Sequence, residues 1–232
     1  MADIRVRGFG QIPPVIKNLV IINLLVWIAQ LTFGEKFWGP LALHFHQHPD
    51  FRIWQLVSYM FLHDPGSILH LLFNMLTLWM FGSEIESLWG SKRFLIFYLI
   101  CGLGAALTQL GALAVEWNML MNSFNAQQIA EGEYIERGRA IVQSTAIGAS
   151  GAVMGVMVAF GYTFPNRELF MIPIPFPIKA KYLLIGYVLL DLFGGINPRY
   201  GDNVAHFAHL GGAIIGFLLV FTMNRFNRRT FY

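Results

Sequence analysis

Long stretches without a charged residue are the feature that most constrains how this chain folds. Charged residues make up only 12% of its 232 residues, whereas 56% are hydrophobic. An ordinary soluble domain carries about 25% charged residues, which cover its surface with groups that water solvates. The composition therefore excludes an ordinary soluble domain, a disordered chain and a collagen-like fibre. It predicts an all-α polytopic membrane protein.

Six of these stretches are apolar enough to cross a bilayer, which takes about 20 residues of helix. The fifth stretch, from Tyr182 to about Ile196, contains one charged residue, Asp191. We expect spans at about residues 15–34, 66–88, 93–115, 147–164, 181–197 and 203–224. Because these spans use most of the chain, residues 1–232 are expected to form a single membrane domain.

The positive charges predict the orientation of this domain. With six spans, eleven of the 16 lysine and arginine residues fall on the side that holds both termini. Cytoplasmic loops of membrane proteins carry such an excess, so both termini are expected to be cytoplasmic. The net charge of +3 then reflects topology and not nucleic-acid binding. We expect a multi-pass protein of the bacterial inner (cell) membrane with no nucleic-acid partner.

Three connections between the spans have distinct characters. The loop 35–65 contains the aromatic segment FRIWQLVSYMFL, which is too short to span and is expected to lie in the membrane interface or re-enter partway. The external loop 116–146 contains AQQIAEGEYIERGRA, which is polar and predicts a small external helix. The cytoplasmic link 164–181 is rich in proline, which predicts an irregular loop.

A few polar residues remain inside the apolar spans, where they are costly and by default mark a functional site. Span two contains His70 and Asn74 one helical turn apart, span four contains Ser150 within a GASG segment, and span six contains His206 and His209. The even-numbered spans run inward. At about 1.5 Å rise per residue, four of these residues therefore lie roughly 5–10 Å below the outer ends of their helices: His70, Asn74, Ser150 and His209. Their common depth predicts one shared site.

Small-residue stripes predict which of these residues meet. A GxxxG stripe follows Ser150 directly (151–155), and a second follows His209 (212–216). Such stripes let helix backbones approach closely, so spans four and six are expected to bring the serine within reach of the histidine. A serine hydroxyl is a weak nucleophile that needs a neighbouring base. The pattern predicts Ser150 as the nucleophile and His209 as the base.

The oxyanion that such a serine generates needs hydrogen-bond donors. The backbone N–H of Ser150, near a helix N-terminus, is one candidate. The Asn74 amide and the His70 ring are two more.

No acidic residue adjoins His209 in the sequence. Asp202 is in the preceding loop and Asp191 is in span five. The sequence therefore favours a Ser–His dyad over a triad. It leaves open whether Asp191 pairs with a backbone group or lines a water path.

Three segments, in chain order, resemble the rhomboid family of intramembrane serine proteases. They are HLLFN (70–74), GASG (148–151) and AHLGGAIIG (208–216). The segment WQLVSYMFLH (54–63) resembles the first external loop of that family. The resemblance extends from about residue 15 to 224 and implies a six-transmembrane-helix rhomboid-like bundle.

The resemblance also implies roles for individual residues. Ser150 would be the nucleophile and His209 the general base, with His70, Asn74 and the Ser150 backbone N–H forming the oxyanion hole. His209 is preferred over His206 because the family pattern Ala-His-x-x-Gly-x-x-x-Gly begins at residue 208.

Four residues are candidates for supporting roles around these groups: His206, Met154, Gly148 and Gly151. Met154 stands four residues beyond the serine, where the family often has an aromatic residue beneath the catalytic histidine.

The function implied is serine-type endopeptidase activity on transmembrane segments of other membrane proteins, near the external side of the bilayer and without a cofactor. The histidines at 44, 46 and 48 fit neither one helix face nor an HExxH motif, so no metal site is expected there.

Two other functions are compatible with parts of the pattern. A rhomboid-like protein can bind membrane clients without cleaving them, but the retained serine and histidine argue against this reading. A small transporter would place polar groups at the bilayer midplane, whereas here they stay in the outer half. Taken singly, the GASG segment is also typical of closely packed helices. His70 and Asn74 taken alone are also typical of an interhelical hydrogen bond.

Overall fold

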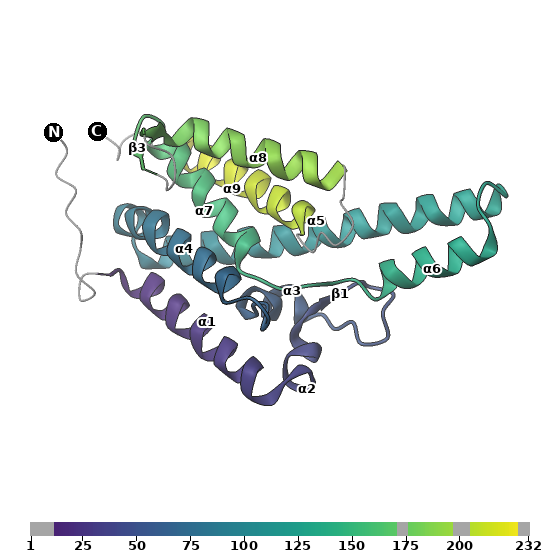
Figure 1. The fold of residues 1–232 in the computed structure, drawn as a ribbon. Helices are drawn as coiled ribbons and strands as arrows, with labels where there is room; N and C mark the ends of the chain where they lie inside the picture. Colours follow the sequence, from purple (N-terminus) through teal and green to yellow (C-terminus); the bar gives the residue numbers. More distant parts are fainter. Residues whose placement is uncertain (1–11, 171–175, 197–204, 227–232) are drawn as a thin grey trace.

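The computed structural model describes residues 12–170, 176–196 and 205–226. Its long helices are α1 (Pro14–Phe33), α4 (Ile68–Trp89), α5 (Ser91–Asn125), α7 (Ser150–Thr163), α8 (Ala180–Ile196) and α9 (His206–Phe226). Figure 1 shows these helices packed into one bundle, from which the second half of α5 extends. Each of them overlaps one of the predicted spans.

Four of these helices are long and apolar enough to cross a membrane. They are α1, α4, α5 and residues His206–Met223 of α9. Helix α7 has 14 residues and α8 has 17, so a full crossing by these two stays a prediction. The prediction of a helical membrane protein is confirmed.

The outward faces of the helices are strongly apolar. Leu25 on α1, Phe73 on α4 and Leu190 on α8 are 59%, 61% and 71% exposed. On a soluble protein, apolar surface spread over several helices would promote aggregation. On an integral membrane protein it is the surface that contacts lipid.

A buried carboxylate fixes the start of α1 to the far end of α4. The Glu86 side chain accepts hydrogen bonds from the backbone N–H groups of Val15 and Ile16, at 3.0 and 2.9 Å. Ser91 donates to the same carboxylate at 2.6 Å. The first N–H groups of a helix have no intrahelical acceptor, and an anion there is further stabilised by the helix dipole. Glu86 therefore anchors α1 on α4.

Helix α7 lies at the centre of the bundle, against α4, α5, α8 and α9. Ten of its 14 residues are buried. A helix that is apolar on every side is expected to pack on every side, and α7 does. Helix α7, which begins at Ser150, is therefore held by four neighbouring helices.

Glycines make the contact between α7 and α9 a backbone contact. A Cβ on Gly212 would overlap the carbonyl oxygen of Gly151, and a Cβ on Gly216 would lie 2.6 Å from Cα of Gly155. The two stripes that the sequence indicated thus face each other, and the predicted contact between spans four and six is confirmed.

Alanine at Gly212 is expected to destabilise the bundle by about 1–3 kcal/mol, because the added methyl group forces α7 and α9 apart. Thermal unfolding in detergent measures the effect. The matched control is Gly111→Ala on α5, where a Cβ would have no atom within 4 Å. This variant is expected to gain up to about 1 kcal/mol from better helix propensity. Equal unfolding temperatures for the two variants would contradict the packing argument.

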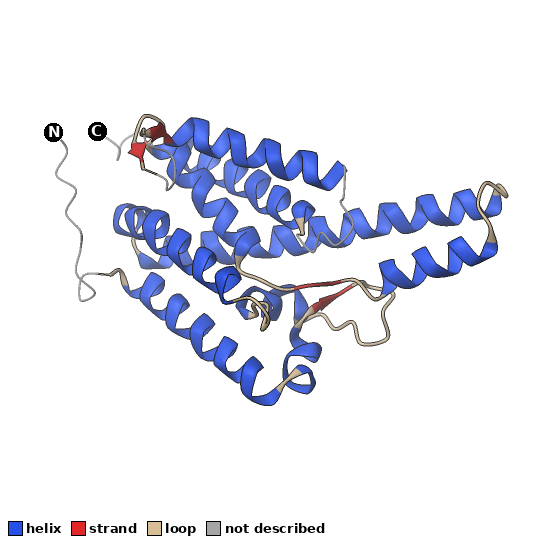
Figure 2. Ribbon diagram, viewed as in Figure 1, coloured by secondary structure: helices blue, strands red, loops and turns tan. Residues whose placement is uncertain are grey.

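Short elements fill the connections (Figure 2). Between α1 and α4 lie α2 (Glu35–Trp38), η2 (Gly39–Leu41), α3 (Gln55–Ser58) and η3 (Tyr59–Phe61). Strand β1 (Leu43–His44) pairs antiparallel with β2 (Thr145–Ala146), just ahead of α7.

The link 164–181 differs from the prediction of an irregular loop. It contains an antiparallel pair, β3 (Glu168–Leu169) with β4 (Ile178–Lys179). Part of the link, residues 171–175, lies outside the described residues.

The region after residue 115 is more helical than predicted. The expected helix within 116–146 is confirmed as α6 (Glu131–Val142), but the third helix continues to Asn125. Helix α6 folds back along α5 and is held there by a buried cluster of Phe45, Leu120 and Ile141.

Candidate active site

The side chains of Ser150 and His209 are in hydrogen-bond contact. Ser150 Oγ lies 2.7 Å from His209 Nε2, and the two residues stand near the starts of α7 and α9. His209 is buried, with 8% of its surface exposed. The contacts between the glycines of α7 and α9 bring the starts of these two helices close together. The arrangement matches what a base must have to take the proton of a hydroxyl nucleophile.

The local backbone presents Ser150 at the tip of α7. Gly148 has φ +132°, a conformation that residues with a side chain rarely adopt, and its N–H donates to the carbonyl of Tyr59 at 3.0 Å. The non-helical segment that follows β2 ends at this glycine, and α7 begins two residues later at Ser150. Its backbone N–H is consequently one of the helix-start donors that the helix itself leaves unused.

Gly148 also keeps a space open between two functional side chains. A Cβ at this position would lie 3.1 Å from His70 Nε2 and 3.5 Å from Ser150 Oγ. If Ser150 acts as a nucleophile, the carbonyl group of a substrate has to fit where both of these atoms can reach it. Gly148 is thus placed where a side chain would obstruct the site.

The hydrogen bonds of His70 indicate where its proton is. The backbone N–H of Asp64 donates to His70 Nδ1 at 3.3 Å, so the neutral ring carries its hydrogen on Nε2. This nitrogen is the one that lies toward Gly148. His70 therefore presents an N–H donor on the side of Ser150.

Asn74 lies one turn further along α4 and is turned toward its own helix. Its amide nitrogen donates to the carbonyl oxygen of His70 at 2.9 Å. Among the described contacts, no hydrogen bond joins Asn74 to Ser150. One amide hydrogen is used within α4, which leaves the other for a further acceptor.

A second buried histidine supports His70 and was not singled out from the sequence. The rings of His63 and His70 meet edge to face, with centroids 5.1 Å apart. Burial, together with the nearby His70, lowers the pKa of His63 to about 3, so this ring is neutral. Gln30 holds the His63 backbone from α1, with hydrogen bonds of 2.8 and 2.9 Å.

An acidic residue contacts the candidate base, which differs from the dyad that the sequence favoured. Asp191 Oδ1 on α8 lies 3.0 Å from His209 Nδ1 and 2.8 Å from His206 Nδ1. The sequence signal was present, since Asp191 is the charged residue inside the fifth apolar stretch. The sequence did not show that Asp191 pairs with His209, because these two residues come together only when α8 packs on α9.

Of the other residues proposed for supporting roles, Gly151 and Met154 are packing residues in the structure. A Cβ on Gly151 would lie 2.5 Å from Cβ of Ala105. Met154 is 2% exposed and packs in a cluster with Val158 and Ala213.

The side chains of His44 and His48 make their contacts within the loop 35–65. The rings of His44 and His48 stack with centroids 4.5 Å apart. His44 Nε2 bonds the carbonyl of Gly39 at 3.0 Å, and His48 Nδ1 accepts from the backbone of Asp50 at 3.1 Å.

The fold and the site together define a helical membrane protein with a serine–histidine pair inside its bundle. Residues 50–226 match the rhomboid domain family, and the chain belongs to that family.

Named relatives extend over most of the chain. It is 29% identical over 217 residues to Rhomboid protease AarA of Providencia stuartii, which covers 87% of this chain and 69% of the relative. It is 28% identical over 220 residues to the mitochondrial Rhomboid protein 1 of Saccharomyces cerevisiae, covering 90% and 56%. It is 25% identical over 222 residues to Rhomboid protease GlpG of Yersinia pestis, covering 95% and 66%. The chain thus spans under two thirds of the last two relatives.

Proposed function

We propose that this chain is an intramembrane serine endopeptidase that cleaves transmembrane segments of other membrane proteins. The observation that carries the proposal is the 2.7 Å contact between Ser150 Oγ and His209 Nε2. Similarity to relatives named rhomboid proteases supports the same reaction. Six spans with cytoplasmic termini, the topology expected from the charges, would open the site toward the external side of the membrane.

The chemistry follows from the positions of the groups. Ser150 Oγ attacks the scissile carbonyl carbon while its proton passes to His209 Nε2. The resulting oxyanion accepts hydrogen bonds from the Ser150 backbone N–H, the His70 Nε2–H and the second N–H of Asn74. His209 then returns the proton to the leaving amine as the C–N bond breaks. Water, activated by the same histidine, hydrolyses the acyl-enzyme.

The substrate must offer an extended stretch of backbone. Within a helix, each carbonyl is already bonded to an N–H four residues on, so neither the nucleophile nor the oxyanion donors can reach it. We therefore expect cleavage near the external end of the substrate helix, at small or helix-breaking residues.

The test is cleavage of a fluorescently labelled single-span substrate by the purified chain in proteoliposomes, with the cut site mapped by mass spectrometry. Wild type is expected to cut the span near its external end. Ser150→Ala is expected to leave only background hydrolysis and to lose labelling by a fluorophosphonate. Cleavage by Ser150→Ala at the wild-type rate would overturn the mechanism. Binding of the substrate without cleavage by wild type would instead favour a client-binding protein.

A further inference from the structure

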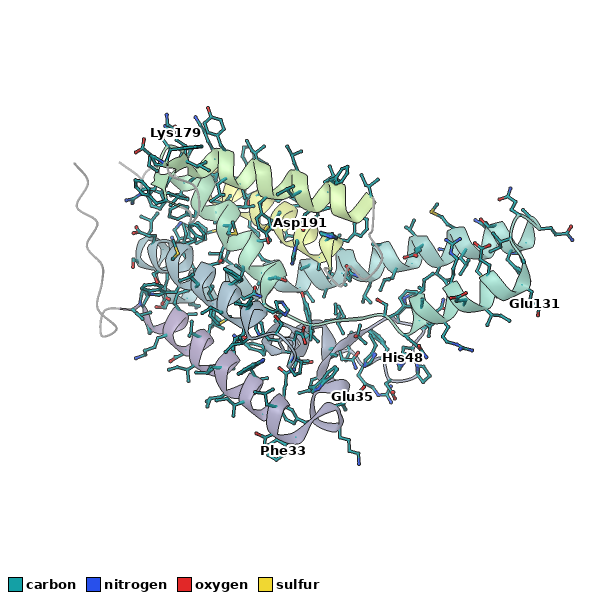
Figure 3. The ribbon with its side chains drawn as sticks, in the orientation of Figure 1. Phe33, Glu35, His48, Glu131, Lys179 and Asp191 are labelled. Atoms are coloured by element: carbon teal, nitrogen blue, oxygen red, sulfur yellow. The ribbon has the colours of Figure 1, made fainter. Side chains whose placement is uncertain are left out.

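Asp191 is a buried carboxylate that serves two histidines with one oxygen atom. Its Oδ1 lies 3.0 Å from Nδ1 of His209 and 2.8 Å from Nδ1 of His206, and only 5% of the residue is exposed. Figure 3 labels Asp191 in the bundle, where α8 meets α9. A buried carboxylate is costly unless donors satisfy it. Two ring N–H groups bond Oδ1, whereas Oδ2 has no hydrogen-bond partner among the described residues.

The contact with His209 decides which ring nitrogen carries the proton. A carboxylate accepts hydrogen bonds, so Nδ1 of His209 must be the N–H donor. In a neutral ring, Nε2 then carries the lone pair, and Nε2 is the atom that faces Ser150 Oγ at 2.7 Å. With the opposite tautomer, a hydrogen would stand where the base has to accept one.

The second histidine is built into the same arrangement. His206 precedes His209 by one turn of α9 and donates through the same ring atom. Gly194, on the Asp191 face of α8, leaves room for it: a Cβ there would lie 2.5 Å from Cε1 and Nε2 of His206. His206 therefore holds the carboxylate in the place where His209 meets it.

We propose that Asp191 is a positioning residue that fixes the tautomer and orientation of His209 and stabilises the imidazolium formed when Ser150 is deprotonated. His206 steadies the Asp191 carboxylate. This inference rests on the proposed protease function, and it makes the reacting group a Ser150–His209–Asp191 chain in which the dyad expected from the sequence has a third member. The carboxylate acts through the histidine and does not touch the substrate.

The test compares substitutions at Asp191 that keep its size or its charge. Asp191→Asn is expected to lower kcat by about 10²-fold or more with KM unchanged, because an amide can donate to Nδ1 and favour the unproductive tautomer. Asp191→Glu, which keeps the carboxylate, is expected to recover part of the loss. His206→Ala is expected to cost about 10-fold. Gly186→Ala, on the same helix with no atom within 4 Å of its Cβ, is the control and should retain wild-type kcat.

Two readouts separate positioning from mere structural support. Imidazole ¹⁵N chemical shifts report the tautomer of His209, which is expected to change in Asp191→Asn while the unfolding temperature stays near that of wild type. The inference is overturned if Asp191→Asn keeps kcat within about threefold, or if its loss of activity follows only its loss of folded protein. Both outcomes are read against an active wild type. An inactive wild type would instead contradict the proposed function.

Discussion

Replacing His209 by alanine is expected to lower kcat by about 10²- to 10⁴-fold, because general base catalysis contributes on this scale. This corresponds to about 2.7–5.5 kcal/mol of lost transition-state stabilisation. The 2.7 Å contact with Ser150 Oγ places His209 Nε2 where it accepts the hydroxyl proton as Oγ attacks. The hydroxyl of the variant stays protonated, so both peptide cleavage and fluorophosphonate labelling of Ser150 should fall together.

Two controls give this prediction its specificity. The double variant Ser150→Ala/His209→Ala should be no slower than Ser150→Ala alone, because groups that act as a unit are not additive. His206→Ala removes the neighbouring histidine of the same helix. It should lower kcat far less, because the His206 ring bonds Asp191 and so acts on the base only through that carboxylate. Losses of equal size at His206 and His209 would contradict the assignment of His209 as the base.

The sequence predicted the meeting of Ser150 and His209 because the information was local to each helix. A glycine stripe on α7 and another on α9 fix which faces of these two helices touch, and both stripes start beside the functional residue. The depth of each residue followed from counting along an apolar stretch. When the contacting faces of two helices and the depth of one residue on each are known, the two side chains can be placed together.

The role of Asp191 was beyond the same method for a physical reason. Helix α8 has no stripe of small residues to define its inner face, and many of its large side chains are exposed along its length. Hydropathy therefore predicts that the helix lies in the membrane, but it does not predict how the helix is rotated about its own axis. Only the packed structure shows that Asp191 faces α9.

Helix boundaries were missed where polar residues continue a helix. The prediction ended the third span at residue 115, yet α5 runs to Asn125 through EWNMLMNSFN, a segment with no proline or glycine to stop it. Hydropathy marks the part of a helix suited to lipid. It does not mark the last hydrogen-bonded turn, which here depends on the packing of α6 against α5.

Removing the His70 ring is expected to lower kcat more than removing the Asn74 amide. The Asp64 N–H bond to Nδ1 leaves the hydrogen of His70 on Nε2, beside the space that Gly148 keeps open. His70→Ala therefore deletes a donor that already points toward Ser150. The loss of one oxyanion donor lowers kcat by about 10²- to 10³-fold. One N–H of the Asn74 amide already donates to the carbonyl of His70, so only its second N–H is left for the oxyanion. We expect Asn74→Ala to lower kcat by about 10-fold, the scale of one ordinary hydrogen bond.

The ranking of these two variants tests which donors the oxyanion uses. Measuring kcat and unfolding temperature for both separates lost donors from lost packing, since His70 also contacts the buried His63 ring. A larger loss in Asn74→Ala would reverse the assignment, because it would mean that the amide turns from its own helix toward the substrate. Losses below about threefold in both variants would leave the helix-start N–H of Ser150 as the donor that stabilises the oxyanion.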